Sequence, residues 1–268
     1  MRAWAGSMAL AMVLLAAGCA SITTTTTSSG ATITSTPSDR TGEADPRKRA
    51  AVRLQLASSY YQQGLLRVAL DEARAVVQMD SDLAGAYALL GLIYMDLDDR
   101  AQADANFQRA LRLEPDNPEW QNNYGWFLCR SGQVQHALPY FERAAGNRLY
   151  PTPGLALGNA GVCLLNERDY RAAEAYLRRA FELDAASPVT KFNLARVYLA
   201  LGQPDRAAFY YGLLDSSLEP TAETLWLGLR IARARGDTRT ERQLGDELRR
   251  RFPGSPEAVA LRRGAYDG

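Results

Sequence analysis

The sequence predicts an all-α helical solenoid, and three observations carry this prediction. One helical position recurs about every 34 residues, a period that indicates stacked repeat units. This position holds mostly small residues: Ala57, Gly91, Gly125, Gly161, Ala195 and Leu229. Apolar side chains recur around each of these positions with the three- and four-residue spacing of one helix face. The composition, with 47% hydrophobic and 23% charged residues, is typical of a folded protein.

The unit over residues 84–117 shows the pattern most clearly. Its diagnostic residues are Tyr87, Leu90, Gly91 and Tyr94 in a first helix, and Ala103, Phe107 and Ala110 in a second. The small residues let the two helices approach closely, and Pro115 ends the second helix. This pattern resembles the tetratricopeptide repeat. The resemblance implies a right-handed superhelical solenoid of about six such repeats.

The repeat pattern also predicts the domain boundaries. We expect a repeat domain over residues 47–257, followed by a C-terminal tail over residues 258–268. The first and last units match the pattern least well, as expected of units that cap a stack. The predicted repeats lie near residues 50–83, 84–117, 118–153, 154–187, 188–221 and 222–255.

Residues 1–18 have the layout of a secretory signal peptide. A basic start and an apolar run over residues 8–15 lead to small residues before Cys19. This run is shorter than the roughly 20 apolar residues of a membrane-spanning helix. Small residues that end at a cysteine resemble the bacterial lipoprotein signal, which implies acylation of Cys19. By the same resemblance, Ala20 favours sorting to the outer membrane; the alternative is a plain signal peptide with an incidental cysteine.

A flexible tether is predicted over residues 19–46. Fourteen of residues 20–46 are Ser or Thr and none is aromatic, so this segment has too little apolar surface to fold. As a flexible coil it would span roughly 30 Å. That length would hold a folded domain clear of a membrane surface.

Charge and reactive residues exclude several functions. The net charge of +1 does not indicate a nucleic-acid partner. Residues 230–263 hold ten Arg against five acidic residues, which indicates either a solvated helix face or a surface for an acidic partner or anionic headgroups. His136 is the only histidine, and no Cys/His cluster has metal-ligand spacing. The sequence therefore predicts a non-enzymatic protein without cofactor or metal.

A candidate protein-binding groove lies on the helix face opposite the core. Asn123, Asn159 and Asn193 occupy one position in three consecutive repeats. An amide both donates and accepts hydrogen bonds, so it can pair with the backbone of an extended peptide. In related repeats, this position with nearby basic residues resembles a clamp for peptide backbone or carboxylate. The alternative is that the asparagines organise neighbouring helices. The remaining predicted groove residues are Asn122, Trp126, Arg130, Phe192 and Arg196.

A second candidate groove is apolar. Tyr61, Leu92 and Met95 are expected to project from the first two repeats towards the same side. They could take a hydrophobic helix or strand of a partner. Packing of this end against the tether is the alternative.

Cys129 and Cys163 form a candidate disulfide. They lie in the first helices of successive repeats, and side-by-side parallel helices could direct them towards each other. A disulfide persists in an oxidising compartment outside the inner membrane. The alternative is two small buried thiols.

Together, the lipoprotein signal, the tether and six repeats resemble the type IV pilus biogenesis and stability lipoproteins, the PilF/PilW pilotin family. The stretches that carry this resemblance are residues 122–129, 150–151, 159–163 and 251–255. It implies an outer-membrane lipoprotein that faces the periplasm, binds the pilus secretin and promotes its localisation and multimerisation. The alternative is a generic periplasmic repeat scaffold or adaptor for envelope assembly or cell-wall enzymes.

Overall fold

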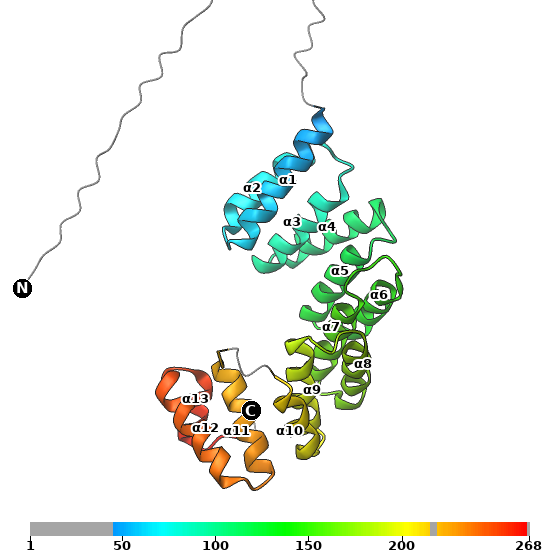
Figure 1. Ribbon diagram of the computed structural model, residues 1–268. Coiled ribbons are helices and arrows are strands. Elements are labelled where there is room, and N and C mark those ends of the chain that lie inside the picture. Colours follow the sequence, from blue (N-terminus) through cyan, green and yellow to red (C-terminus); the bar gives the residue numbers. More distant parts are fainter. Residues whose placement is uncertain (1–44, 215–218, 267–268) are drawn as a thin grey trace, which may run out of the picture. The chain divides into compact units, whose positions relative to one another are not determined.

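The computed structural model describes residues 45–214 and 219–266, which form helices and their connections without a β-strand (Figure 1). The predicted all-α solenoid is confirmed. The predicted signal peptide, Cys19 and all but the last two residues of the predicted tether lie outside the described residues.

Thirteen helices follow one another in the described part of the chain, and the first twelve form six consecutive pairs. The pairs are α1 (Pro46–Gln62) with α2 (Leu66–Met79), α3 (Ala84–Asp96) with α4 (Arg100–Leu113), α5 (Pro118–Arg130) with α6 (Val134–Gly146), α7 (Pro153–Asn166) with α8 (Tyr170–Leu183), α9 (Pro188–Ala200) with α10 (Pro204–Gly212), and α11 (Ala222–Ala234) with α12 (Thr238–Arg251).

One further helix, α13 (Pro256–Arg263), begins before the predicted start of the C-terminal tail. Ala258 is fully buried in a small core with Leu225 and Leu248. The packed domain therefore extends into the segment that was expected to be a tail, because α13 covers the apolar side of the last helix pair.

The two helices of each pair belong to different layers. Each odd-numbered helix from α1 to α11 contacts the next odd-numbered helix, whereas no two even-numbered helices in the described residues are in such contact. The odd-numbered helices therefore form the continuous inner layer, and the even-numbered helices lie outside it. The first helix of each repeat thus provides the face on which the candidate groove residues were expected.

The position that holds small residues permits close contact within each of the central pairs. A Cβ atom on Gly91 would lie 2.7 Å from the Phe107 ring, and one on Gly161 would lie 2.5 Å from Cγ of Leu177. Phe107 and Leu177 are fully buried. A large side chain of the second helix therefore fills the space that the missing side chain of the first helix leaves.

The last two pairs depart from this arrangement. Helix α10 has 9 residues, whereas α8 has 14. After α10, Leu214 occupies the repeat position that Ala180 holds in the preceding repeat. In the last pair, Leu229 occupies the usual glycine position and Gly245 occupies the position of the large partner. A Cβ atom on Gly245 would lie 3.4 Å from Cδ1 of Leu229, an ordinary contact distance. The volumes of the two positions are exchanged.

Candidate functional site

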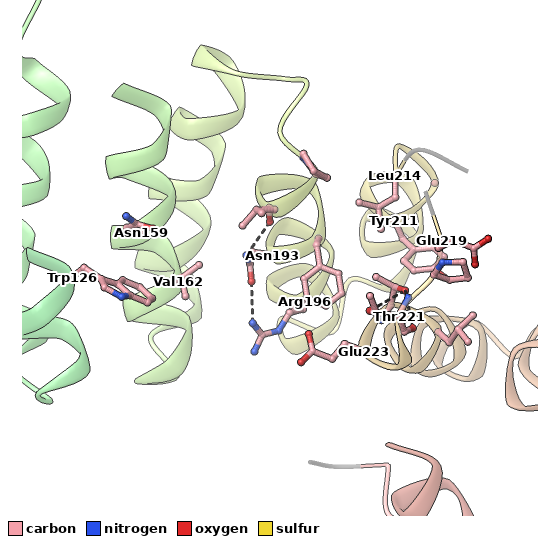
Figure 2. A pocket seen from close by; sticks show the side chains of 17 residues that line it. Trp126, Asn159, Val162, Asn193, Arg196, Tyr211, Leu214, Glu219, Thr221 and Glu223 are labelled. Atoms are coloured by element: carbon pink, nitrogen blue, oxygen red, sulfur yellow. Dashed lines mark hydrogen bonds between the residues drawn. The ribbon is translucent and has the colours of Figure 1, made fainter. Parts of the chain in front are cut away.

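A pocket of about 830 Å³ opens on the inner layer, between α5, α7 and α9 on one side and the end of α10 and the start of α11 on the other (Figure 2). Figure 2 shows Trp126 and Val162 towards one end of this pocket and Tyr211 and Leu214 towards the other, with Asn193 between them. Five of the eight predicted groove residues line it: Trp126, Asn159, Phe192, Asn193 and Arg196.

The early end of α10 makes room for this pocket. The chain leaves the helix at Gly212, and Leu214, Pro220 and Leu225 then form the far wall. These residues and Tyr211 were not among the predicted site residues. The sequence does contain a signal for Leu214. The three preceding repeats have alanine at this position, and a leucine there is too large for a close contact between helices.

Arg196 is the cation of the pocket, and its orientation is set by neighbours on α9. Its Nη1 donates to Oδ1 of Asn193 at 2.9 Å, and Nδ2 of Asn193 donates to the carbonyl of Val189 at 2.9 Å. The guanidinium also lies 5.9 Å from the centre of the Phe192 ring. Asn193 is only 5% exposed, so it acts as an internal support for Arg196.

The electrostatic environment of Arg196 lacks a paired carboxylate. Among the described residues, no carboxylate oxygen lies within 4.0 Å of the guanidinium nitrogens of Arg196, the distance that defines an ion pair. Burial lowers the pKa of Arg196; the charge of Glu223 raises it, and that of Arg230 lowers it further. The other acidic residue at the pocket, Glu219, is paired with Arg251. The charge of Arg196 is thus partly desolvated and only weakly compensated.

The first asparagine of the predicted groove lies inside the domain. We expected Asn122 to point away from the core, but it is only 6% exposed and its Oδ1 accepts a hydrogen bond of 3.0 Å from Nδ2 of Asn159. This hydrogen bond joins α5 to α7. It also satisfies the polar side-chain oxygen of Asn122, which is buried from water. Asn123 differs: it is partly exposed, and its side chain forms no hydrogen bond to the described residues.

Arg130 belongs to a separate polar network on the first three odd-numbered helices. Its Nη1 lies 3.0 Å from Oδ1 of Asp96, and the Tyr61 hydroxyl donates to Oδ2 of Asp96 at 2.7 Å. Burial and this hydrogen bond raise the pKa of Tyr61, so its hydroxyl remains a donor. The two candidate grooves therefore meet here, as Tyr61 and Arg130 share one carboxylate.

The apolar candidate groove is less open than expected. Met95 was expected to project into it but is 8% exposed and packs into the main core. Leu92 is partly buried against the same core. Of the three predicted residues, Met95 is thus mainly a packing residue.

Cys129 and Cys163 are paired in the structure. Their sulfur atoms lie 2.01 Å apart and their Cα atoms 5.8 Å apart. The pair joins α5 to α7, the same two helices that Asn122 and Asn159 connect. Trp126 and Val162 of the pocket lie three and one residues before these cysteines, so the bridge holds one wall of the pocket.

Three further features of the described residues bear on function. Within residues 45–214 and 219–266, no group of three or more His, Cys, Asp or Glu side chains could hold a metal ion. In the same ranges no helix combines the length and apolarity needed to cross a membrane. His136 is exposed at the start of α6.

Comparisons with known proteins identify the repeats and the relatives. Profiles of the tetratricopeptide repeat match residues 88–153, 128–188 and 164–215. The type IV pilus assembly protein PilF of Pseudomonas aeruginosa is 27% identical over 204 residues, which are 76% of this chain and 81% of PilF.

Two solved structures extend this similarity to the fold. The crystal structure of PilW, described as a widely conserved type IV pilus biogenesis factor, has a TM-score of 0.75 and 30% identity over 80% of this chain and 98% of PilW. The structure of Pseudomonas aeruginosa PilF has a TM-score of 0.72 and 25% identity, over 82% of this chain and 99% of the PilF chain. The chain therefore belongs to the tetratricopeptide repeat proteins, is homologous to PilF, and is structurally similar to the type IV pilus biogenesis proteins PilW and PilF.

Proposed function

We propose that this protein is a pilotin of type IV pilus biogenesis: an outer-membrane lipoprotein that binds the pilus secretin and promotes its localisation and multimerisation. The observation that carries this proposal is the similarity to PilW, which spans 98% of that chain at 30% identity. A likeness over the whole length of a relative includes both the inner layer and the order of the repeats, rather than one repeat unit.

The proposed mechanism joins a membrane anchor to a binding surface. Acyl chains on Cys19 would supply the membrane affinity, since two or three chains anchor a protein stably at about 0.8 kcal/mol per buried CH₂. The inner layer of odd-numbered helices would hold a segment of the secretin. Linking the two through the tether raises the concentration of the secretin at the membrane without any further contact. The proposal includes no catalytic step.

Within the inner layer, the proposed contact residues are those that reach the surface. These are Asn123, Trp126, Phe192 and Arg196, with Arg130 on the adjoining network. Asn122, Asn159 and Asn193 support them through the hydrogen bonds between and along the helices.

The first experiment is affinity purification of the tagged protein from detergent-solubilised envelopes. We expect the pilus secretin to co-purify, and deletion of the gene to reduce secretin multimers and piliation. Recovery of other envelope or cell-wall enzymes without secretin, together with unchanged multimers, would contradict the proposal and favour a general repeat scaffold.

The anchor is tested separately with Cys19→Ser. We expect this variant to leave the membrane fraction, because it cannot be acylated. If fractionation still finds the variant in the outer membrane, acylation of Cys19 is not the anchor.

A further inference from the structure

We infer that the pocket beside α10 binds a segment of the partner that places a hydrophobic side chain between Trp126, Val162 and Phe192 and a carboxylate on Arg196. This inference deepens the proposed binding function and rests on it: it gives the chemistry of the segment that the inner layer holds.

The size and lining of the pocket favour a hydrophobic anchor. Its volume of about 830 Å³ lies within the roughly 300–1,000 Å³ of sites that enclose small ligands. Trp126 and Val162 come from α5 and α7, Phe192 from α9, and Leu225 from α11, so four inner helices contribute apolar surface. An aromatic or branched aliphatic side chain would remove this surface from water.

Charge complementarity favours an acidic group beside that anchor. Arg196 is directed by Asn193 and has no carboxylate partner within 4.0 Å among the described residues. Since Asn193 occupies Nη1, the other N–H groups of the guanidinium are available to a carboxylate, which pairs with arginine in a two-pronged geometry. A partner carboxylate would compensate a charge that burial has partly desolvated.

Two arginines on other inner helices differ from Arg196 because each already has a carboxylate partner. Arg130 already pairs with Asp96, and Arg233 pairs with Glu241. Glu223, on the pocket wall at the start of α11, is the acidic residue whose charge acts on Arg196. The negative charge of Glu223 would repel an incoming carboxylate. Glu223 therefore limits the affinity of the pocket for an acidic group, and its removal should raise this affinity.

The test uses two dipeptide probes, acetyl-Phe-Asp-amide and acetyl-Asp-Phe-amide, each compared with its Asn counterpart. Binding to the full-length protein is measured by saturation-transfer difference NMR titration. We expect saturable binding of at least one acidic probe, and about tenfold weaker binding of its Asn counterpart, as for loss of a charge-assisted hydrogen bond. Replacing Phe by Ala in the probe should abolish saturable binding.

Variants of charged residues test how the pocket recognises the carboxylate of the probe. Arg196→Gln should weaken the acidic probe about tenfold, Arg196→Lys by less, and Glu223→Gln should strengthen it severalfold. Arg233→Gln is the matched control and should leave binding unchanged. If Arg196→Gln lowers the melting temperature strongly, the Glu223→Gln and Arg196→Lys titrations decide, since both keep a cation in the pocket.

Absence of saturable binding, equal binding of the Asp and Asn probes, or equal binding to wild type and Glu223→Gln would overturn the inference. Probe binding with the expected pattern but no secretin in the affinity purification would retain the pocket chemistry and refute the pilotin proposal. Secretin recovery that Arg196→Gln and Glu223→Gln leave unaltered would refute the pocket chemistry alone.

Discussion

The second to fourth repeats and the last two repeats use the same helical positions with different distributions of side-chain volume. In the central repeats a glycine on the inner helix faces a large side chain on the outer helix, as Gly91 faces Phe107. In the last pair Leu229 faces Gly245, and in the pair before it the outer helix ends early. The comparison shows that the central repeats are closely packed, whereas the end of the domain leaves an open pocket where one helix is short.

The largest expected effect tests the packing of the central repeats. Phe107→Ala removes a fully buried ring, so we expect the free energy of unfolding to fall by about 3–5 kcal/mol. Phe209→Ala in α10 is the control: Phe209 is 61% exposed, and its loss should change stability by about 0.5 kcal/mol or less. Urea denaturation of both variants measures the difference. Equal effects would contradict the contrast between the two regions.

The next effect concerns the bridge between α5 and α7. If Cys129 and Cys163 are oxidised in the exported protein, replacing both with serine should cost roughly 3–4 kcal/mol, because the bridge restricts the unfolded chain. A reducing agent should lower the stability of the wild type but not of the double variant. Nonreducing mass spectrometry that finds two free thiols would refute the bridge.

A glycine substitution should have opposite signs in the two regions. Gly161→Ala would place a Cβ atom 2.5 Å from Cγ of Leu177, so we expect a loss of about 1–3 kcal/mol from overpacking. Gly245→Ala makes only an ordinary contact with Leu229 and improves helix propensity, so it should gain up to about 1 kcal/mol. Thermal unfolding of both variants measures this, and a gain at Gly161 or a marked loss at Gly245 would show that the volumes are not exchanged.

The smallest expected effect on stability is that of Asn123→Ala, and comparison with Asn159→Ala separates the two kinds of asparagine. Asn159→Ala leaves the buried Oδ1 of Asn122 without its partner, so we expect a loss of about 1–3 kcal/mol. Asn123→Ala removes no hydrogen bond within the described residues and should leave melting nearly unchanged while weakening partner binding. If instead Asn123→Ala lowers stability as much as Asn159→Ala, the asparagines act only as helix connectors.

Much of the fold could be predicted from the sequence because the same pattern of small and large residues recurs in several repeats. Gly91, Gly125 and Gly161 recur at nearly one spacing, and the large partners recur with them, so each unit supports the interpretation of the next. The extension of the domain into α13 was missed because a single short helix at the end of a stack has no repeat to confirm it.

The candidate site was less predictable, since a helical wheel gives the direction of a side chain but not its neighbours. Positions for Trp126, Phe192 and Arg196 were predicted on one face, and the structure brings them to one pocket. Asn122 on α5 lies within hydrogen-bond distance of Asn159 on α7, and this contact between repeats decides the burial of Asn122. The pocket itself depends on where α10 ends, which the repeat period does not specify.

The central claim is that the inner layer at α5–α9 holds the pilus secretin, and site-specific photocrosslinking in cells tests it most directly. Trp126→p-benzoylphenylalanine places the photoreactive group in the pocket, and Phe209→p-benzoylphenylalanine places it on the exposed side of α10, outside that pocket. We expect a crosslink to the pilus secretin from the first position and none from the second. A secretin crosslink from Phe209 alone, or none from Trp126 in a piliated strain, would contradict the claim.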